Sequence, residues 1–264
     1  GLLRGIGAPS PDGPDDELPP QPPASAPAPV AGPGRFDVGG LLARAGVARV
    51  APRVDVSSWG PAFWAALEQL RHHPPATWPA GGVDLDVVEQ VVTVEGLPLV
   101  GVPRADAVTG LLAAGDRAER VHLLLAREGE VLADCREALR GVRHGQLADG
   151  KRLARAALDA FDDGHHEAAA ALAATVAGAA LARVLRGPGA QVQQQVLLDP
   201  DLAPYTGLRL RAALAPLVTL LRSERPAVVT DRGEALVVVA VVSSAVRALA
   251  ELRELVETAQ RAAS

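Results

Sequence analysis

The segment that most constrains the fold begins near position 231. Large apolar residues recur in it at spacings of four, four, three, three and four: Val238, Val242, Val246, Leu249, Leu252 and Val256. This is the period of an α-helix, and the length of the segment favours a helix over a buried strand at 237–242. Its first half is apolar on every side, so we expect this helix at the centre of a bundle.

The segments that precede this helix are also helical in pattern, so the predicted fold class is all-α. Helices are predicted at 117–142, 151–161, 165–185 and 208–221. Asp116 is the expected N-cap of the first, and Pro216 should kink the last. Short loops between consecutive helices favour antiparallel neighbours. Residues 116–264 are therefore predicted to form a four- or five-helix bundle.

The chain ahead of the bundle divides into two parts. Residues 1–36 are rich in proline and poor in large apolar side chains, so we expect a disordered tail. Residues 37–115 are predicted to form a small, mostly helical module, with helices at 84–95 and 105–114. A short apolar run at 97–102, bounded by glycine and proline, is the only stretch that suggests a strand.

The apolar runs are too short to predict a membrane span. The longest uncharged ones cover 168–182 and 235–246, whereas a span requires about 18 or more residues. We therefore expect both runs to be buried core helices and the protein to have no membrane-spanning segment.

Composition and the absence of motifs limit the function classes. A net charge of −5 gives the whole chain no positive surplus for nucleic acid or anionic membranes. The single cysteine, Cys135, cannot form an internal disulfide, which favours a reducing, cytoplasmic compartment, and it lies on an apolar helix face as a core residue. The sequence contains no GxSxG, no glycine-rich phosphate loop and no zinc-ligand spacing, so we expect no cofactor.

One pair of residues raises the hypothesis of a metal site. Asp162 and His166 are one helical turn apart, and this spacing could hold a hydrated metal ion of a metal-dependent hydrolase. The alternative is structural: Asp163 caps the helix that follows, and the neighbouring acidic side chains favour its positive end.

Three arginines raise the hypothesis of a nucleic-acid-binding surface. Arg136, Arg140 and Arg143 form a basic ridge on the outer side of the helix at 117–142, where a phosphate backbone could lie. Acidic residues of the same helix, among them Glu137, favour a mixed and solvated face instead.

The stretch Asp163-Gly164-His165-His166-Glu167-Ala168-Ala169 leads into an alanine-rich helix and resembles a helix start of HEPN-like helical bundles. That family includes toxin ribonucleases and abortive-infection proteins as well as inactive binding modules. The resemblance implies that an arginine, followed by a polar residue and then a histidine, carries RNA cleavage. The corresponding place here is Arg222-Ser223, and no histidine follows it, so the expected general base is missing. Arg117 and His122 have the family's spacing but lie at the start of a different helix.

A second resemblance covers the front half of the chain. Trp78-Pro79, Asp84-Leu85-Asp86, Gly96-Leu97-Pro98-Leu99-Val100 and Pro103-Arg104-Ala105 resemble uncharacterised actinobacterial proteins. This resemblance implies no activity.

Together these observations favour a bacterial, non-catalytic interaction or regulatory module that binds a protein or RNA through the bundle. One alternative is a HEPN-type RNase toxin of a stress or phage-defence system, with Arg222, Arg117 and His122 as candidate catalytic residues. The other is the metal-dependent hydrolase at Asp162 and His166. A homodimer through the apolar last helix also remains open.

Overall fold

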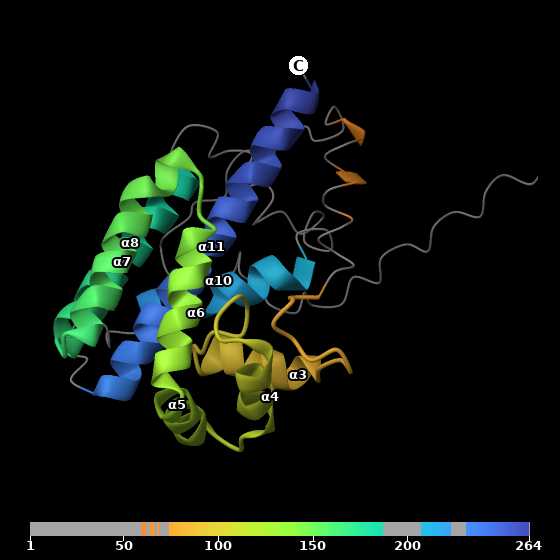
Figure 1. The fold of residues 1–264 in the computed structure, drawn as a ribbon. Coiled ribbons are helices and arrows are strands. Elements are labelled where there is room, and N and C mark those ends of the chain that lie inside the picture. The colour runs from red at the N-terminus through yellow and green to blue at the C-terminus, as the bar shows by residue number, and fades with distance from the viewer. Residues whose placement is uncertain are drawn as a thin grey trace, which may run out of the picture. The chain divides into compact units, whose positions relative to one another are not determined.

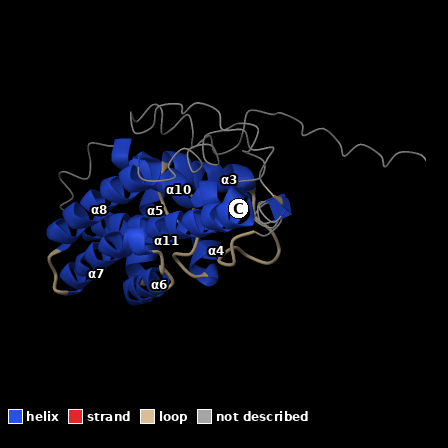
Figure 2. Ribbon diagram, turned by 90° about the horizontal axis from the view of Figure 1, so that it is seen from above, coloured by secondary structure: helices blue, strands red, loops and turns tan. Residues whose placement is uncertain are grey.

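The computed structural model describes parts of 60–68 and residues 74–186, 207–222 and 231–263. The side chains of 183–186, 207, 208, 222, 259, 260, 262 and 263 lie outside the described part, as does the whole predicted tail at 1–36. Within the described residues the chain forms helices and loops and no strand (Figure 2). The predicted all-α class is confirmed.

The elements follow one another along the chain as labelled in Figure 1. They are α3 (Leu85–Glu89), the π-helix η1 (Gln90–Val94), α4 (Ala105–Ala113), α5 (Arg117–Ala126), α6 (Glu128–Arg140), the 3-10 helix η2 (Gly145–Leu147), α7 (Ala148–Asp162), α8 (His166–Arg186), α10 (Gly207–Arg222) and α11 (Arg232–Ala263). Most predicted helices are confirmed with small shifts at their ends. The described parts of the predicted module at 37–115 and of the bundle at 116–264 share one apolar core.

The long helix α11 lies at the centre of this core. It contacts α5, α6, α7, α8 and α10 (Figure 1). All six apolar residues of the predicted stripe are buried: Val238, Val242, Val246, Leu249, Leu252 and Val256. Each buried valine or leucine contributes about 1.5–3 kcal/mol to stability relative to an exposed one. The helix predicted from periodicity therefore organises the packing of the others.

The same helix is long and apolar enough to cross a membrane by length and composition alone. Within the segment Arg232–Thr258 the most apolar 18-residue window has a mean hydropathy of 2.0, and 89% of that window is buried inside the protein. The uncharged run at 235–246 is shorter than a span, as the sequence indicates, but the apolar helix extends beyond it.

A helical hairpin of α7 and α8 packs beside α11 (Figure 1). Gly164 in its turn has a φ of 83°, a left-handed conformation that favours glycine. The backbone N–H of Gly164 donates to Phe161 O at 3.0 Å, which satisfies a carbonyl at the end of α7. Asp163 is the C-cap residue of α7. The prediction that it caps the next helix is wrong, because the left-handed turn separates it from α8.

The predicted helix at 117–142 is wrong as a single element. The backbone of Arg127, at φ −114° and ψ 25°, ends α5 and precedes α6. Leu124 and Val131 on either side of the break are both buried in the same core. The apolar pattern continues across the break because both helices face α11, so periodicity alone could not reveal it.

The predicted strand at 97–102 is instead an extended segment with no partner strand in the described part of the chain. Leu97, Leu99 and Val102 are fully buried. Side chains satisfy its carbonyls in place of a neighbouring strand: Trp78 Nε1 donates to Leu99 O at 2.9 Å, and Ser244 Oγ donates to Val100 O at 2.6 Å.

Candidate functional site

The first turns of α5 and α11 carry the same short sequence pattern. In each helix an aspartate precedes an arginine, a small residue and a glutamate, at 116–119 and 231–234. Asp116 Oδ1 accepts from the backbone N–H of Glu119 at 2.9 Å, and Asp231 Oδ1 accepts from that of Glu234 at 3.0 Å. Both aspartates therefore act as side-chain N-caps.

Arg117, a candidate catalytic residue, joins these two helix ends. Its guanidinium forms two hydrogen bonds to the Glu234 carboxylate, with Nη2 to Oε2 at 2.7 Å. Its Nε donates to Glu95 O at 2.9 Å. The hydrogen bond to Glu234 raises the pKa of Arg117. These contacts make Arg117 a clamp between α5, the segment after η1 and α11.

The other candidate catalytic residues do not converge on Arg117. His122 is exposed on α5. Residues five positions apart on an α-helix point about 140° apart, so the family's spacing does not bring this pair together on one face. Arg222 ends α10, and its side chain lies outside the described part.

A buried ion pair lies next to this clamp and was not found from the sequence. Arg120 and Glu95 are 5% and 9% exposed in their side chains, and Arg120 Nη1 lies 2.8 Å from Glu95 Oε1. Arg120 also donates to Leu111 O at 2.8 Å and to Ala114 O, at the end of α4. One sequence signal existed: Arg120 lies four residues before buried Leu124, on the apolar face of α5.

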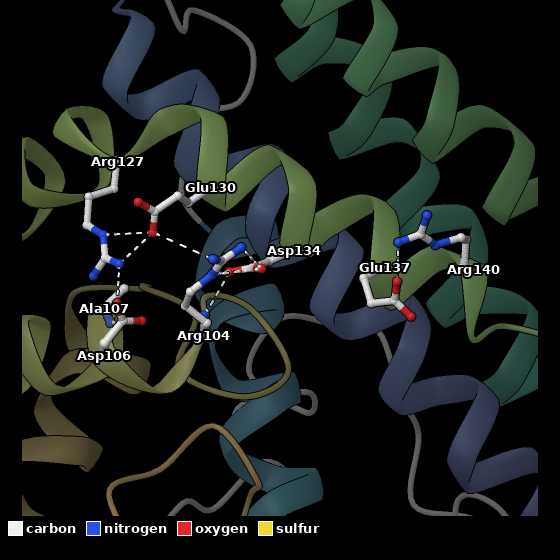
Figure 3. Close-up of polar contacts among 8 residues, drawn as sticks. All are labelled: Arg104, Asp106, Ala107, Arg127, Glu130, Asp134, Glu137 and Arg140. Atoms are coloured by element: carbon white, nitrogen blue, oxygen red, sulfur yellow. Dashed lines mark hydrogen bonds and ion pairs between the residues drawn. The ribbon is translucent and has the colours of Figure 1, made fainter.

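A chain of charged residues crosses the surface between α4 and α6 (Figure 3). Asp106 pairs with Arg127, which also pairs with Glu130. Arg104 binds Asp134 with Nη2 at 2.8 Å from Oδ1 and with its backbone N–H at 2.9 Å from Oδ2. The hydrogen bond from Arg127 lowers the pKa of Asp106. These contacts hold α4 against the junction of α5 and α6.

The predicted basic ridge is largely paired with acidic groups. Arg136 pairs with Asp162 on α7. Arg140 pairs with Glu137 one turn earlier on α6, as Figure 3 shows. Arg143 is exposed and forms no ion pair within the described residues. The three arginines therefore do not present an uninterrupted positive surface.

Arg136 also lines a shallow depression between α6 and α7. Arg155, Leu158 and Asp159 line the rest of it. Asp159 and the nearby Asp162 offset the charge of the two arginines. This depression offers a phosphate group no clear excess of positive charge.

The structure does not assemble a metal site around Asp162 and His166. Asp162 accepts a hydrogen bond from Arg136. The His166 ring packs on Phe161, with centroids 4.6 Å apart, and its Nδ1 is buried without a hydrogen-bond partner in the described part. Among the described residues no group of three potential ligand side chains could hold a metal ion.

Cys135 is fully buried on the core side of α6. Burial raises the pKa of its thiol to about 12, with a smaller opposing effect of a hydrogen bond involving Ser243. Because the thiolate is the nucleophilic form, this cysteine is not available for nucleophilic catalysis at neutral pH.

His144, which follows α6, binds the distal half of α11. Its Nε2 lies 2.6 Å from Glu257 Oε1, and its Nδ1 accepts from the backbone N–H of Gln146 at 3.3 Å. Because Nδ1 accepts, the neutral ring carries its proton on Nε2 and donates to Glu257. This hydrogen bond lowers the pKa of Glu257, and the charges of Arg253 and Arg261 lower it further.

The Glu257 carboxylate should make stability depend on pH. A depressed carboxyl pKa contributes stability above its unfolded value, near 4.5, and this contribution is lost as the pH falls through the folded pKa. We expect Glu257→Gln to be less stable than wild type at pH 7, with a difference that shrinks below pH 4.5. Urea unfolding of both proteins between pH 3.5 and 7 measures this, and a difference that is constant with pH would contradict it.

A pocket lies between α10, α11 and the loop at Val100 and Gly101. Its apolar lining is buried and includes Leu210, Ala213 and Leu252. Partly exposed charged side chains complete it: Arg209 Nη2 and Arg247 Nε both donate to Glu251 Oε1, each at 2.9 Å. No sequence motif marks these residues, because the pocket is formed by three segments that are far apart along the chain.

Comparison with protein-family models, with curated proteins and with solved structures finds no match to this chain.

Proposed function

We propose that the protein is a non-catalytic interaction or regulatory module built on a HEPN-like bundle. The observation that supports this most directly is the contact of Arg117 with Glu234 and with Glu95 O. A catalytic arginine needs donors directed at the substrate. Here the donors of Arg117 are engaged in holding two helices together.

Two further observations support the same proposal. His122 points away from the Arg117 clamp, so a general base and an arginine do not face one reacting atom. The α7–α8 hairpin carries the stretch at 163–169 that resembles HEPN-like bundles, and that family includes inactive binding modules. The proposal places the protein in the cytoplasm of an actinobacterium, in keeping with its single cysteine and its composition.

The two catalytic alternatives have less support. The RNase alternative depends on Arg222 or on the pair of Arg117 and His122. The metal-dependent hydrolase depends on Asp162, which pairs with Arg136 in place of a ligand set. Both alternatives can be tested with the same purified protein.

We expect the purified full chain to leave total RNA and transfer RNA intact on a gel, with or without EDTA. His122→Ala and Arg222→Ala should behave as wild type in the same incubation. The physical reason is that, among the side chains that the structure describes, no arginine–histidine pair is positioned for proton transfer.

Cleavage by wild type that disappears in either variant would establish an RNase and overturn the proposal. Cleavage that only EDTA abolishes, and that His166→Ala also removes, would support the metal-dependent alternative. A mock purification from cells without the protein controls for contaminating nuclease.

A further inference from the structure

We propose that the pocket between α10 and α11 binds an acidic peptide segment of a protein partner. One small apolar side chain of the segment enters the pocket, and flanking carboxylates bind Arg209 and Arg247. This inference rests on the proposed interaction function and names the class of partner.

The charge of the pocket selects an anion. Two guanidinium groups share one carboxylate oxygen of Glu251, which leaves the pocket one positive charge in excess. A guanidinium has five N–H donors, and one on each arginine is used on Glu251. Donors therefore remain for a second carboxylate, which an arginine can bind with two parallel hydrogen bonds.

The C-cap glycine of α6, Gly141, lies against one of the two arginines. A Cβ atom on Gly141 would lie 1.9 Å from Arg247 Nη1, so the guanidinium occupies space that only a glycine leaves open. Arg247 is thus held between the end of α6 and Glu251, one helical turn further along α11. A positioned guanidinium loses less conformational entropy on binding than a free surface arginine.

The size of the pocket selects a single side chain. Its volume of about 30 Å³ is far below that of a small-molecule or cofactor site, for which ~300 Å³ is a lower figure. The pocket therefore has room only for a group about as small as a valine side chain. Most of the affinity must then come from a chain that continues over the charged rim, as a peptide does.

The lining argues against single-stranded RNA as the occupant. Proteins bind unpaired bases by stacking them on aromatic side chains, and none of the described residues that line this pocket is aromatic. An aliphatic floor beneath two arginines fits an apolar side chain next to carboxylates.

The test uses fluorescence polarisation with the full chain and a labelled nine-residue peptide that has a central valine flanked by glutamates. We expect saturable binding, weakened by added salt. A peptide with lysines in place of the glutamates, and one with serine in place of the valine, should bind at least about tenfold more weakly.

Variants of the charged residues should change the affinity in opposite directions. Arg209→Gln should weaken binding about tenfold, whereas Glu251→Gln should strengthen it several-fold, because it removes the internal competitor for the arginines. Arg155→Gln, which removes an arginine at the other depression, should leave the affinity unchanged. Circular dichroism and the melting temperature of each variant show whether it is folded.

The absence of saturable binding, or weaker binding by folded Glu251→Gln, would overturn the inference. Binding of a labelled single-stranded RNA that Arg209→Gln abolishes would replace the peptide by RNA as the occupant. Neither result bears on RNA cleavage, so failure of this inference and failure of the proposed function are distinguishable.

Discussion

Glu95→Ala is expected to lower the free energy of unfolding by about 3–5 kcal/mol. The substitution leaves the Arg120 guanidinium, 5% exposed, without its carboxylate partner inside the core. Arg120 keeps its hydrogen bonds to Leu111 O and Ala114 O, but these stabilise the protein by less than the unpaired buried charge destabilises it. Urea unfolding followed by circular dichroism at pH 7 measures the change.

The surface pair of Glu137 and Arg140 provides the matched control. Both side chains are mostly exposed, so Glu137→Ala should cost less than about 1 kcal/mol. Replacing both buried partners, Glu95→Leu with Arg120→Leu, should recover much of the loss, because no charge is then left unpaired. A loss below 1 kcal/mol for Glu95→Ala would show that water or another group compensates Arg120.

Gly233→Ala should destabilise the protein by about 1–3 kcal/mol, although alanine is the better helix former. Gly233 is the second residue of α11 and is buried against α5. A Cβ atom there would lie 2.7 Å from Val121 Cγ1 and 3.1 Å from Asp231 Oδ1. Because valine is branched at Cβ, its side chain cannot easily move aside, so the first turn of α11 must shift.

Gly129 supplies the control because it is the second residue of α6. Nothing lies within 4 Å of a Cβ built on it. Gly129→Ala should therefore stabilise the protein by about 0.5–1 kcal/mol, through helix propensity alone. In a double-mutant cycle, Val121→Ala should reduce the cost of Gly233→Ala. Equal effects of the two glycine substitutions would contradict the close approach of α5 and α11.

The helices were predictable where apolar residues recur along one face with the period of an α-helix. The stripe at Val238, Val242 and Val246 identified α11 as the central helix, because period and all-round apolarity are properties of a local segment. The N-cap Asp116 was predictable for the same reason, and its side chain does accept from the backbone of Glu119.

Features that depend on contacts between distant segments were not predictable. The apolar period does not indicate that the helix is interrupted at Arg127, and the contact of Arg127 with Asp106 joins residues 21 positions apart. The apolar run at 97–102 has the composition of a strand, but the sequence does not show that Trp78 and Ser244 bind its carbonyls.

For the candidate site residues too, contacts within one helix were predictable and contacts between distant segments were not. Arg117 was singled out for its spacing to His122, whereas its partner Glu234 lies 117 residues away. The ridge at Arg136 and Arg140 shares its helix with acidic residues, which predicted a surface of mixed charge. Glu137 does pair with Arg140. The pair of Arg136 with Asp162, on another helix, could come only from the structure.

The position of α11 at the centre of the core has a consequence for how the chain folds during synthesis. The helices that pack on it, α5, α6, α7, α8 and α10, are all translated before it. Until α11 is made, the faces of α5, α6, α7 and α8 that it covers have no partner, and an incomplete chain exposes them to aggregation. Some contacts of α11 with the earlier helices span more than 100 residues in sequence, as between Arg117 and Glu234. Such long-range closure is slow for a helical protein, so the nascent chain is expected to depend on chaperones more than a bundle with local contacts does.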